Sequence, residues 1–285
     1  MEVIKMHGLG NDFVCLDRFL STPDLEDYPE LARSLCHRHF GVGADGLIVI
    51  LPSTKADAKM RIFNADGSEP EMCGNGIRCF AKYLYDSGYV PKEEMTVETL
   101  AGILTVKLSV DQGEAQMITV NMGQPKLKPE EIPVKITGRQ VVGEKLQVNG
   151  RTLVFTAVSM GNPHCVIFTP AFEDLEFTAL GPALEKHPLF PQKTNVEFVR
   201  VDNPSELTVK VWERGVGPTL ACGTGACASV VAAVLEGKCE RKVTVHLPGG
   251  DLYIEWGLDD QVLMTGSAVY VFQAILLNDK PKRRN

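Results

Sequence analysis

EMCGNGIRCF, residues 71–80, places a cysteine directly before a Gly-Asn-Gly turn, at the point where a helical pattern begins. LACGTGACAS, residues 220–229, repeats this arrangement far along the chain, with Cys222 in the position that Cys73 holds in the first stretch. One Gly-x-Gly turn before a helix often marks only a tight change of direction. Two of them, each preceded by a cysteine, indicate an internal repeat.

The apolar residues that follow each cysteine predict a helix. Between Ile77 and Tyr85 they recur three and four positions apart, which forms one face of an amphipathic helix. The residues after Cys222 are apolar nearly all round, as in a helix that is buried within its domain. We expect two helices that each end before a glycine, at 77–86 before Gly88 and at 226–236 before Gly237.

A thiol at the start of a helix lies near unpaired backbone N–H groups and the positive end of the helix dipole. Both stabilise an anion, so we expect them to lower the pKa of Cys73 and Cys222. The glycines leave the same N–H groups open to a substrate carboxylate. Two such thiols suit the inversion of a carbon acid, which needs a base on one face and an acid on the other. The pair would titrate as a coupled unit, with one thiol charged and one neutral.

The two cysteines lie at matching distances from a Gly-Asn pair. Asn11, in GLGNDFVCL, precedes Cys73 by 62 residues, and Asn162, in SMGNPHCVIF, precedes Cys222 by 60 residues. MRIFNADGSEPEMCGNG also aligns with VKVWERGVGPTLACGTG without a gap. The chain is therefore expected to consist of two halves of similar plan.

Short runs of β-branched residues, bounded by Gly, Pro, Asn or Asp, dominate the rest of the chain and predict many strands. Two further helices are predicted, at 29–38 and 180–186. Residues 123–138, GQPKLKPEEIPVKITG, are rich in Pro and Lys and are typical of a linker between the halves. Many strands with few helices favour an α+β fold with antiparallel or mixed sheets over a doubly wound fold.

The composition excludes several classes of function. The 285 residues are 44% hydrophobic and 23% charged, as in an ordinary globular protein, and their net charge is −7. Nucleic-acid-binding proteins usually show a basic field, whereas the one basic cluster here is the tail DKPKRRN at 279–285, which we expect to be solvated. No apolar run approaches a membrane span, and the N-terminus lacks the plan of a signal peptide. We expect a cytoplasmic protein with neither nucleic acid nor membrane as a partner.

A set of motifs runs almost from end to end: HGLGNDFV, NADGSEPEMCGNGIRCF, GNPH, TNVEFV, WERGVGPTLACGTGACA and TGSAVYVFQ. Together they closely resemble the diaminopimelate epimerase family. The resemblance implies two pseudo-symmetric α+β domains, each a mixed or antiparallel sheet or barrel around a central helix. We therefore expect an N-terminal domain of 1–124 plus 268–285 that contributes Cys73, and a C-terminal domain of 125–267 that contributes Cys222. The active site is expected in the cleft between them.

The same resemblance implies a function. It implies a cofactor-independent, two-base epimerisation of LL- to meso-2,6-diaminopimelate, in lysine and peptidoglycan-precursor biosynthesis. The family's two catalytic cysteines fall on Cys73 and Cys222. His164, in GNPH, lies where the family has a histidine near the reacting centre, so it is a candidate auxiliary residue, as is Glu213. For His164 a hydrogen-bonded structural histidine is the alternative.

The resemblance also implies a set of substrate-binding side chains, which are Asn11, Asn64, Asn162, Asn195, Glu213 and Arg214. Backbone N–H groups of a second set, Gly74, Asn75, Gly223 and Thr224, are implied to hold the reacting carboxylate. A zwitterionic amino-acid end needs a carboxylate for its ammonium and a guanidinium for its carboxylate, which adjacent Glu and Arg residues supply. For three of the asparagines the alternative is the capping of turns or helices, namely Asn11, Asn64 and Asn195.

Two positions bear on how closely the chain follows the family. Many members carry Gln where this chain has Gly46, so one side-chain contact to substrate is missing; a backbone contact or Asp45 could replace it. Tyr270 lies where some members place a tyrosine at a dimer contact, which implies a homodimer. A buried aromatic residue is the alternative for Tyr270.

Other enzymes of the same fold are alternatives. Proline and hydroxyproline racemases also use paired cysteines, but their cyclic substrates have a single amino-acid head and do not require the asparagines or the Glu213–Arg214 pair. Phenazine-type isomerases lack the cysteine pair, so Cys73 and Cys222 argue against them.

A metal-binding module is the alternative from another class. The chain has eight cysteines, and Cys73-x5-Cys79 with Cys222-x4-Cys227 would supply four thiols for zinc or an iron–sulfur cluster. Neither spacing is the tight C-x2-C of such sites, and we interpret Cys79 and Cys227 as packing residues. No single lysine stands out for a pyridoxal phosphate enzyme, so we expect no metal and no other cofactor.

Overall fold

The computed structural model describes residues 1–20, 27–173 and 175–277. The chain forms two compact units, one of Met1–Val120 together with the segment from Ser267 onward, and one of Asn121–Gly266. The strand that returns to the first unit is β17 (Val269–Ile275), which pairs antiparallel with β1 (Glu2–Gly8). The basic tail at 279–285 lies outside the described residues.

The first unit is a mixed sheet with two helices. Its other strands are β2 (Asn11–Asp17), β3 (Gly46–Leu51), β4 (Ala58–Asn64), β5 (Glu94–Thr99), β6 (Gly102–Asp111) and β7 (Glu114–Asn121). They pair in chain order, β2 with β3 and β4 with β5 in parallel and the other neighbours antiparallel. Helix α1 (Tyr28–Cys36) lies between β2 and β3 in the chain, and α2 (Gly74–Asp86) between β4 and β5.

The second unit repeats this order. Its elements are the short 3-10 helix η1 (Pro129–Glu131), β8 (Glu144–Val148), β9 (Arg151–Ser159), β10 (Pro163–Phe168), α3 (Phe177–Glu185), β11 (Asn195–Asn203), β12 (Glu206–Glu213), β13 (Gly217–Thr219), α4 (Gly223–Leu235), β14 (Lys242–Leu247), β15 (Gly250–Trp256) and β16 (Val262–Gly266). The parallel pairs are β10 with β11 and β12 with β14, and each of them encloses a helix in the chain order. The internal repeat predicted from the sequence is therefore present in the topology, and the mixed α+β class is confirmed.

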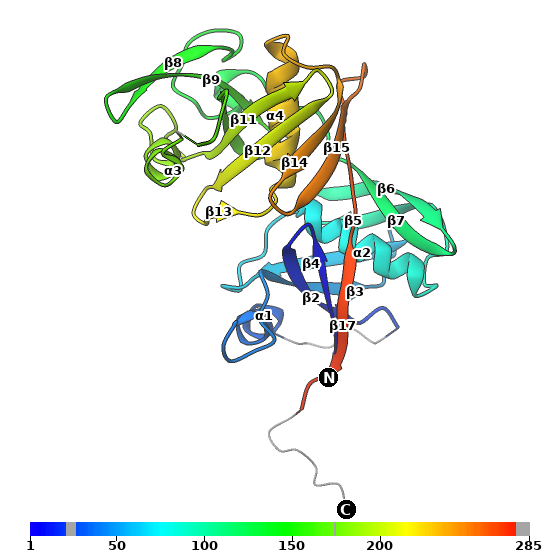
Figure 1. Ribbon diagram of the computed structural model, residues 1–285. Coiled ribbons are helices and arrows are strands. Elements are labelled where there is room, and N and C mark those ends of the chain that lie inside the picture. Colours follow the sequence, from blue (N-terminus) through cyan, green and yellow to red (C-terminus); the bar gives the residue numbers. More distant parts are fainter. Residues whose placement is uncertain (21–26, 174, 278–285) are drawn as a thin grey trace, which may run out of the picture. The chain divides into compact units, whose positions relative to one another are not determined.

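Each unit surrounds one central helix. Helix α4 contacts β9, β10, β11, β12, β14, β15 and β16, and Figure 1 shows it against the strands of its unit. Helix α2 contacts β1, β2, β3, β4 and β6. Since strands cover α4 on all sides, its apolar sequence and its almost complete burial have the same cause.

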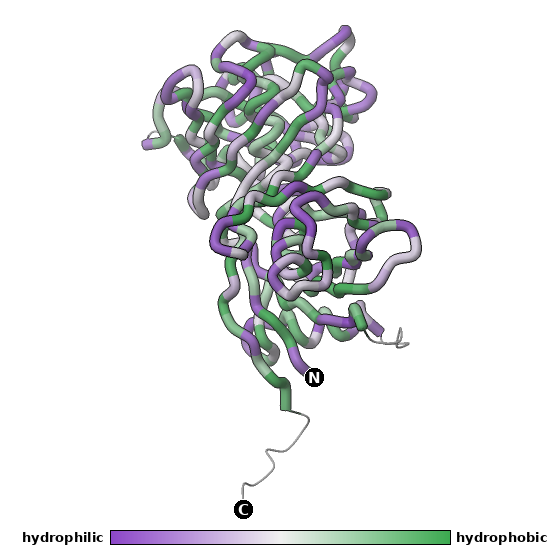
Figure 2. The backbone as a smooth tube through the Cα atoms, turned by 90° about the vertical axis from the view of Figure 1, so that its right-hand side faces the viewer, coloured by the Kyte–Doolittle hydropathy of each residue, from purple (hydrophilic) through white to green (hydrophobic). Residues whose placement is uncertain are grey.

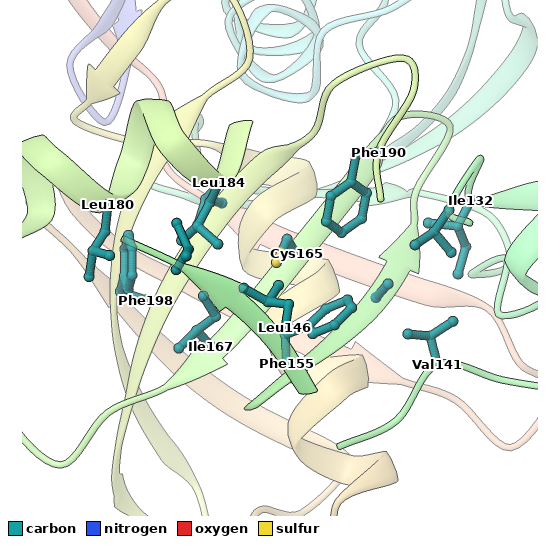
Figure 3. Packing of buried hydrophobic residues seen from close by; sticks show 14 residues of the cluster. Ile132, Val141, Leu146, Phe155, Cys165, Ile167, Leu180, Leu184, Phe190 and Phe198 are labelled. Carbon is teal, nitrogen blue, oxygen red and sulfur yellow. The ribbon is translucent and has the colours of Figure 1, made fainter. Parts of the chain in front are cut away.

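Apolar strand residues build the core of the second unit. Figure 3 shows the cluster that includes Phe155 of β9, Cys165 of β10 and Phe198 of β11, all fully buried. Leu180 and Leu184 of α3 pack onto it. Figure 2 shows apolar and polar stretches interleaved along the whole backbone. This packing holds the strands that carry the candidate site.

The central helices begin three residues earlier than the apolar pattern predicts. Helix α2 starts at Gly74 and α4 at Gly223, so each Gly-x-Gly triplet forms the first helical residues instead of a separate turn. The apolar pattern could not show this, because glycine adds no side chain to the periodicity. The stop signals are correct, because Gly88 and Gly237 both have positive φ after the last helical residues.

The prediction of a linker at 123–138 is wrong in one respect. The segment is mostly irregular, but Ile132 is fully buried and Val134 nearly so in the core of the second unit. The backbone of Lys126 also bridges to Ser159 of β9. The segment is therefore part of the second unit, because two apolar residues among its prolines and lysines reach the core.

Gly46, the position where many family members carry Gln, lies in a tightly packed strand pair. Its strand β3 is buried along its whole length, and Gly46 is aligned with Asn64 of β4. A Cβ atom at this position would lie 2.7 Å from the carbonyl oxygen of Phe63, which is a backbone atom that cannot move away alone. The backbone here accepts only glycine without a shift of β4.

Replacement of Gly46 by Gln should therefore destabilise this protein. We expect the free energy of unfolding, measured by urea denaturation, to fall by about 2 kcal/mol, because the new side chain displaces the Phe63 carbonyl. Thr105→Gln on the exposed face of β6 is the control and should change it by less than about 0.5 kcal/mol. Equal stability of the two variants would contradict the packing argument.

Candidate active site

Cys73 and Cys222 each occupy the position directly before a helix. Cys73 has an extended backbone (φ −138°, ψ 118°) before α2, and Cys222 has φ −115° and ψ 110° before α4. Each cysteine carbonyl accepts the first helical hydrogen bond, from Ile77 N at 2.9 Å and from Ala226 N at 3.0 Å. The N–H groups of the Gly-x-Gly residues have no helical carbonyl to bind, so both helix starts can receive an anion.

The last glycine of each triplet lies in a closely packed environment. A Cβ atom at Gly225 would lie 2.8 Å from Glu197 Oε1 and 3.3 Å from Cys222 Sγ. At Gly76 it would lie 2.9 Å from Ile62 Cδ1. The glycines therefore serve the packing around each cysteine as well as access to the backbone.

In the first unit polar side chains lie around Cys73. Asn11, at the start of β2, accepts hydrogen bonds on Oδ1 from Cys73 Sγ at 3.8 Å and from Asn75 Nδ2 at 3.1 Å. Its Nδ2 donates to Asp45 Oδ2 at 2.7 Å. Because a carboxylate only accepts hydrogen bonds, Asp45 fixes the amide of Asn11 with its oxygen toward Cys73.

A charged network lies behind Asn11. Arg38 donates to Asp12 Oδ1 at 2.9 Å and to Asp45 Oδ1 at 2.7 Å, and the buried Lys5 donates to Asp12 Oδ2 at 2.5 Å. Burial alone would raise the pKa of Asp12, but the hydrogen bonds from Arg38 and Lys5 outweigh it and lower that pKa to about 2. Both carboxylates thus have cationic partners, which keeps the acceptor behind Asn11 in place.

Asn64 lies at the exposed end of β4 and closes a turn. Its Nδ2 donates to Ser68 Oγ at 2.9 Å, and its backbone N–H donates to the Ser68 carbonyl at 2.8 Å. The structure thus places Asn64 in the turn-capping geometry considered as its alternative role.

In the second unit a chain of hydrogen bonds ends at Cys222. Cys222 Sγ lies 3.5 Å from Thr224 Oγ1 and accepts from Gly225 N at 3.4 Å. Thr224 Oγ1 accepts from Asn162 Nδ2 at 3.3 Å, and Asn162 Oδ1 lies 2.9 Å from His164 Nε2. His164 Nδ1 lies 2.7 Å from Glu197 Oε1, and both of these side chains are fully buried.

The expected lowering of the Cys222 pKa is wrong for this structure. Burial raises the pKa of Cys222 well above its ordinary value, and the negative charges of Glu213 and Glu197 raise it further. The hydrogen bonds from Thr224 and from the N–H of Gly225 act in the opposite direction but are smaller. At neutral pH Cys222 is therefore a thiol, because the helix start does not compensate for the loss of water.

Glu213, Arg214 and Asn195 lie together at the end of β12. Asn195 Oδ1 accepts from Arg214 N at 2.8 Å, and its Nδ2 donates to the carbonyl of Pro163 at 3.1 Å. Glu213 Oε1 accepts from Thr219 Oγ1 at 2.5 Å. The buried Asn195 thus joins β10, β11 and the residue after β12, and it fixes the backbone that presents Arg214.

The other cysteines after the two helix starts are packing residues, and the described residues offer neither a metal site nor a membrane-spanning helix. Cys79 and Cys227 are fully buried, and burial raises the pKa of Cys79 to about 12. Among the residues described, no three His, Cys, Asp or Glu side chains gather as a metal site would require. No helix in the described ranges has both the length and the apolarity needed to cross a bilayer.

The sequence analysis missed Glu197 and the network of Lys5, Arg38 and Asp12. Glu197 stands between Val196 and Phe198 in a strand that is buried on both faces. A charged residue within such an apolar run is a signal that could have identified it, since buried carboxylates need a partner. The partner itself, His164, is remote in sequence and could not be read from spacing.

Comparison with solved structures identifies the fold. The chain is similar to a phenazine biosynthesis protein from Bacillus anthracis, with a TM-score of 0.69 and 18% identity over 97% of this chain and 99% of that chain. It is also similar to a probable proline racemase from Agrobacterium radiobacter, with a TM-score of 0.71 and 15% identity over 98% of this chain and 93% of that chain. At these identities the likeness concerns the fold alone.

Sequence comparison identifies the family. The family model described as Diaminopimelate epimerase matches residues 3–128 and 156–271. A diaminopimelate epimerase from Desulfitobacterium hafniense is 67% identical over 98% of this chain and 99% of the relative. One from Moorella thermoacetica is 56% identical over 96% of this chain and 98% of the relative. With the repeated topology and the two cysteines before α2 and α4, these matches show that the chain belongs to the diaminopimelate epimerase family.

Proposed function

We propose that the chain interconverts LL- and meso-2,6-diaminopimelate, with Cys73 and Cys222 as the two acid–base groups. The observation that carries the proposal is the Cys-Gly-x-Gly sequence at both central helices, where each cysteine directly precedes the first helical residue. The relatives that share half or more of the residues along nearly the whole chain are named for this reaction.

In the proposed chemistry one proton leaves one face of the α-carbon and another proton is added to the opposite face. A thiolate removes the α-proton from one face and becomes a thiol, and the carbanion takes a proton from the second thiol on the opposite face, which becomes a thiolate. Helix N–H groups near Gly74, Asn75, Gly223 and Thr224 would stabilise the negative charge that develops on the substrate carboxylate. In the reverse direction the two cysteines exchange roles.

The raised pKa of Cys222 supports an assignment of the starting roles. Because burial and two neighbouring carboxylates keep Cys222 protonated at neutral pH, it is the proposed initial acid. Cys73, which is less buried and lies beside Asn11, is then the proposed initial base. One thiol and one thiolate form a coupled unit, so their titrations belong to the pair.

The proposed substrate contacts follow the chemistry of a double-headed amino acid. Glu213 would bind an ammonium group and Arg214 a carboxylate, since a charged hydrogen bond is about twice as strong as a neutral one. Three asparagines, Asn11, Asn64 and Asn162, offer both donors and acceptors and would orient the polar groups around the stereocentre. Asn195 would act by holding the backbone of Arg214, as its hydrogen bond at 2.8 Å suggests.

Two thiols supply both proton transfers, so the proposed reaction requires no metal, pyridoxal phosphate or other cofactor. The product serves lysine and peptidoglycan-precursor biosynthesis, which is a cytoplasmic process. Eight free cysteines support a reducing compartment.

We also propose a homodimer through β17. The side chains of this strand are mostly exposed although they are apolar, with Val271 at 53% and Ile275 at 74% exposure. Figure 2 shows the chain that leads to the C-terminus largely in the hydrophobic colour. Tyr270 lies in this strand, and burial, with the neighbouring carboxylate of Asp86, raises its pKa. A second copy of the chain would cover this surface. A group of neighbouring exposed apolar side chains marks an interaction site, whereas single exposed apolar residues need no partner.

Both cysteines should be essential. In deuterated water the wild type should interconvert LL- and meso-diaminopimelate with incorporation of α-deuterium, measured by NMR and mass spectrometry. We expect Cys73→Ser and Cys222→Ser each to lose activity by about a thousandfold or more, because a serine hydroxyl is a far weaker acid and base. Cys239→Ser, a change of a partly exposed thiol outside α4, is the control and should retain full activity. Full epimerase activity in Cys222→Ser would refute the two-base reaction.

The substrate should separate the proposal from the racemase alternative. We expect turnover of LL-diaminopimelate to exceed that of L-proline by about a hundredfold or more, because proline has no second head for Glu213 and Arg214. Polarimetry of each substrate with the same enzyme preparation measures the ratio. Preferred turnover of L-proline would overturn the proposed substrate.

The oligomeric state should depend on β17. Light scattering after size exclusion should give the mass of two chains for the wild type and of one chain for Phe272→Glu, because a charge in an apolar contact costs several kcal/mol. Tyr253→Ala, which removes an aromatic side chain of 50% exposure from β15, is the control and should remain a dimer. A wild type with the mass of one chain would contradict the proposed dimer.

A further inference from the structure

Glu197 is a fully buried carboxylate with one hydrogen-bonding partner. Its Oε1 lies 2.7 Å from His164 Nδ1, and its Oε2 has no hydrogen-bond partner among the residues described. A buried carboxylate is costly unless a cation or a proton compensates for it. His164 is the partner of this carboxylate, and which of its ring nitrogens donates depends on its tautomer.

From His164 the hydrogen bonds continue to Cys222 through groups that can act as donor or acceptor. The links are His164 Nε2 to Asn162 Oδ1 at 2.9 Å, Asn162 Nδ2 to Thr224 Oγ1 at 3.3 Å, and Thr224 Oγ1 to Cys222 Sγ at 3.5 Å. An amide carries both a donor and an acceptor end, and a hydroxyl group can do both at one atom. The direction of the whole chain is therefore set by its first link, at His164 Nε2.

The chain has two consistent directions. When Nε2 carries a proton, it donates to Asn162, Asn162 donates to Thr224, and the Thr224 hydroxyl donates to a thiolate at Cys222. When Nε2 carries none, the amide of Asn162 turns over and donates to it. Thr224 then donates to Asn162 and accepts the S–H of Cys222, so this direction favours the thiol.

We propose that Glu197 is a positioning residue of the reaction: with His164 it sets the direction of the hydrogen-bond chain that ends at Cys222 Sγ. This inference rests on the proposed function and adds a residue to it. One direction of the chain presents a donor to a Cys222 thiolate, and the other presents an acceptor to its S–H, as the two directions of the reaction require.

The charges around Cys222 support this assignment. The carboxylate of Glu213 faces it from the end of β12 and that of Glu197 from β11, and both oppose its ionisation. His164 of β10 contacts Glu197, and Cys165 of the same strand lies close enough to be affected by the charge of Glu197. A Cβ atom at Gly225 would lie 2.8 Å from Glu197 Oε1 and 3.3 Å from Cys222 Sγ, so the carboxylate and the sulfur both lie close to this position.

Alkylation of Cys222 tests the proposal without substrate. In the full chain carrying Cys73→Ser, the S–H of Cys222 loses its proton to solvent, and the thiolate displaces iodide from iodoacetamide. Below the pKa this rate is proportional to the thiolate fraction, and peptide mass spectrometry follows Cys222 alone. At about pH 8 we expect Glu197→Gln to react about tenfold faster, because the opposing charge is gone. Thr224→Val should react about tenfold slower, because the thiolate loses its donor.

Two further variants separate charge from shape. Glu197→Asp keeps the charge and should react within about threefold of the parent. Glu236→Gln changes a carboxylate at the opposite end of α4, where it accepts from Thr156, and should react within about twofold. Equal rates for Glu197→Gln and the parent, or a faster Thr224→Val, would overturn the proposal. Because no substrate is used, these outcomes stand whether or not the proposed epimerase activity is found.

Discussion

The structure depends on one constraint, which is that the first turn of a buried helix leaves its N–H groups without helical partners. In each unit a ring of strands surrounds such a helix, so its start must be satisfied by whatever residue precedes it and by what binds there. A cysteine in that place contributes a polarisable sulfur, and the glycines of the Gly-x-Gly triplet let neighbouring atoms pack close to it. The strand order, the glycines and the polar residues at strand ends all follow from building this arrangement twice.

The two units differ in the residue that hydrogen-bonds to the asparagine near each cysteine. Asn11 donates to Asp45, whose carboxylate is held by Arg38 and can only accept, so the orientation of Asn11 is fixed. Asn162 faces His164, whose ring nitrogen can accept or donate, so the orientation of Asn162 depends on the tautomer of His164. A repeat in the backbone thus carries two different hydrogen-bonding environments around its two cysteines.

Much of the fold could be predicted from the sequence, because strand and helix patterns and the glycine stops are local properties. The position of both cysteines before a helix and the internal repeat could be predicted for the same reason. The start of α2 at Gly74 was not, since glycine leaves no periodic signal, and neither was the packing of Ile132, which depends on a distant core. The thiol pKa of Cys222 was predicted with the wrong sign, because burial and the charge of Glu197 come from strands remote in sequence. Local reasoning identified the chemical groups but not their surroundings.

The close approach of Gly225 and Glu197 also couples two positions that are remote in sequence. A Cβ atom at 225 would lie 2.8 Å from Glu197 Oε1, so a larger residue there requires the carboxylate to move. The two positions lie on different elements, α4 and β11, and we expect substitutions at them to be interdependent in related sequences.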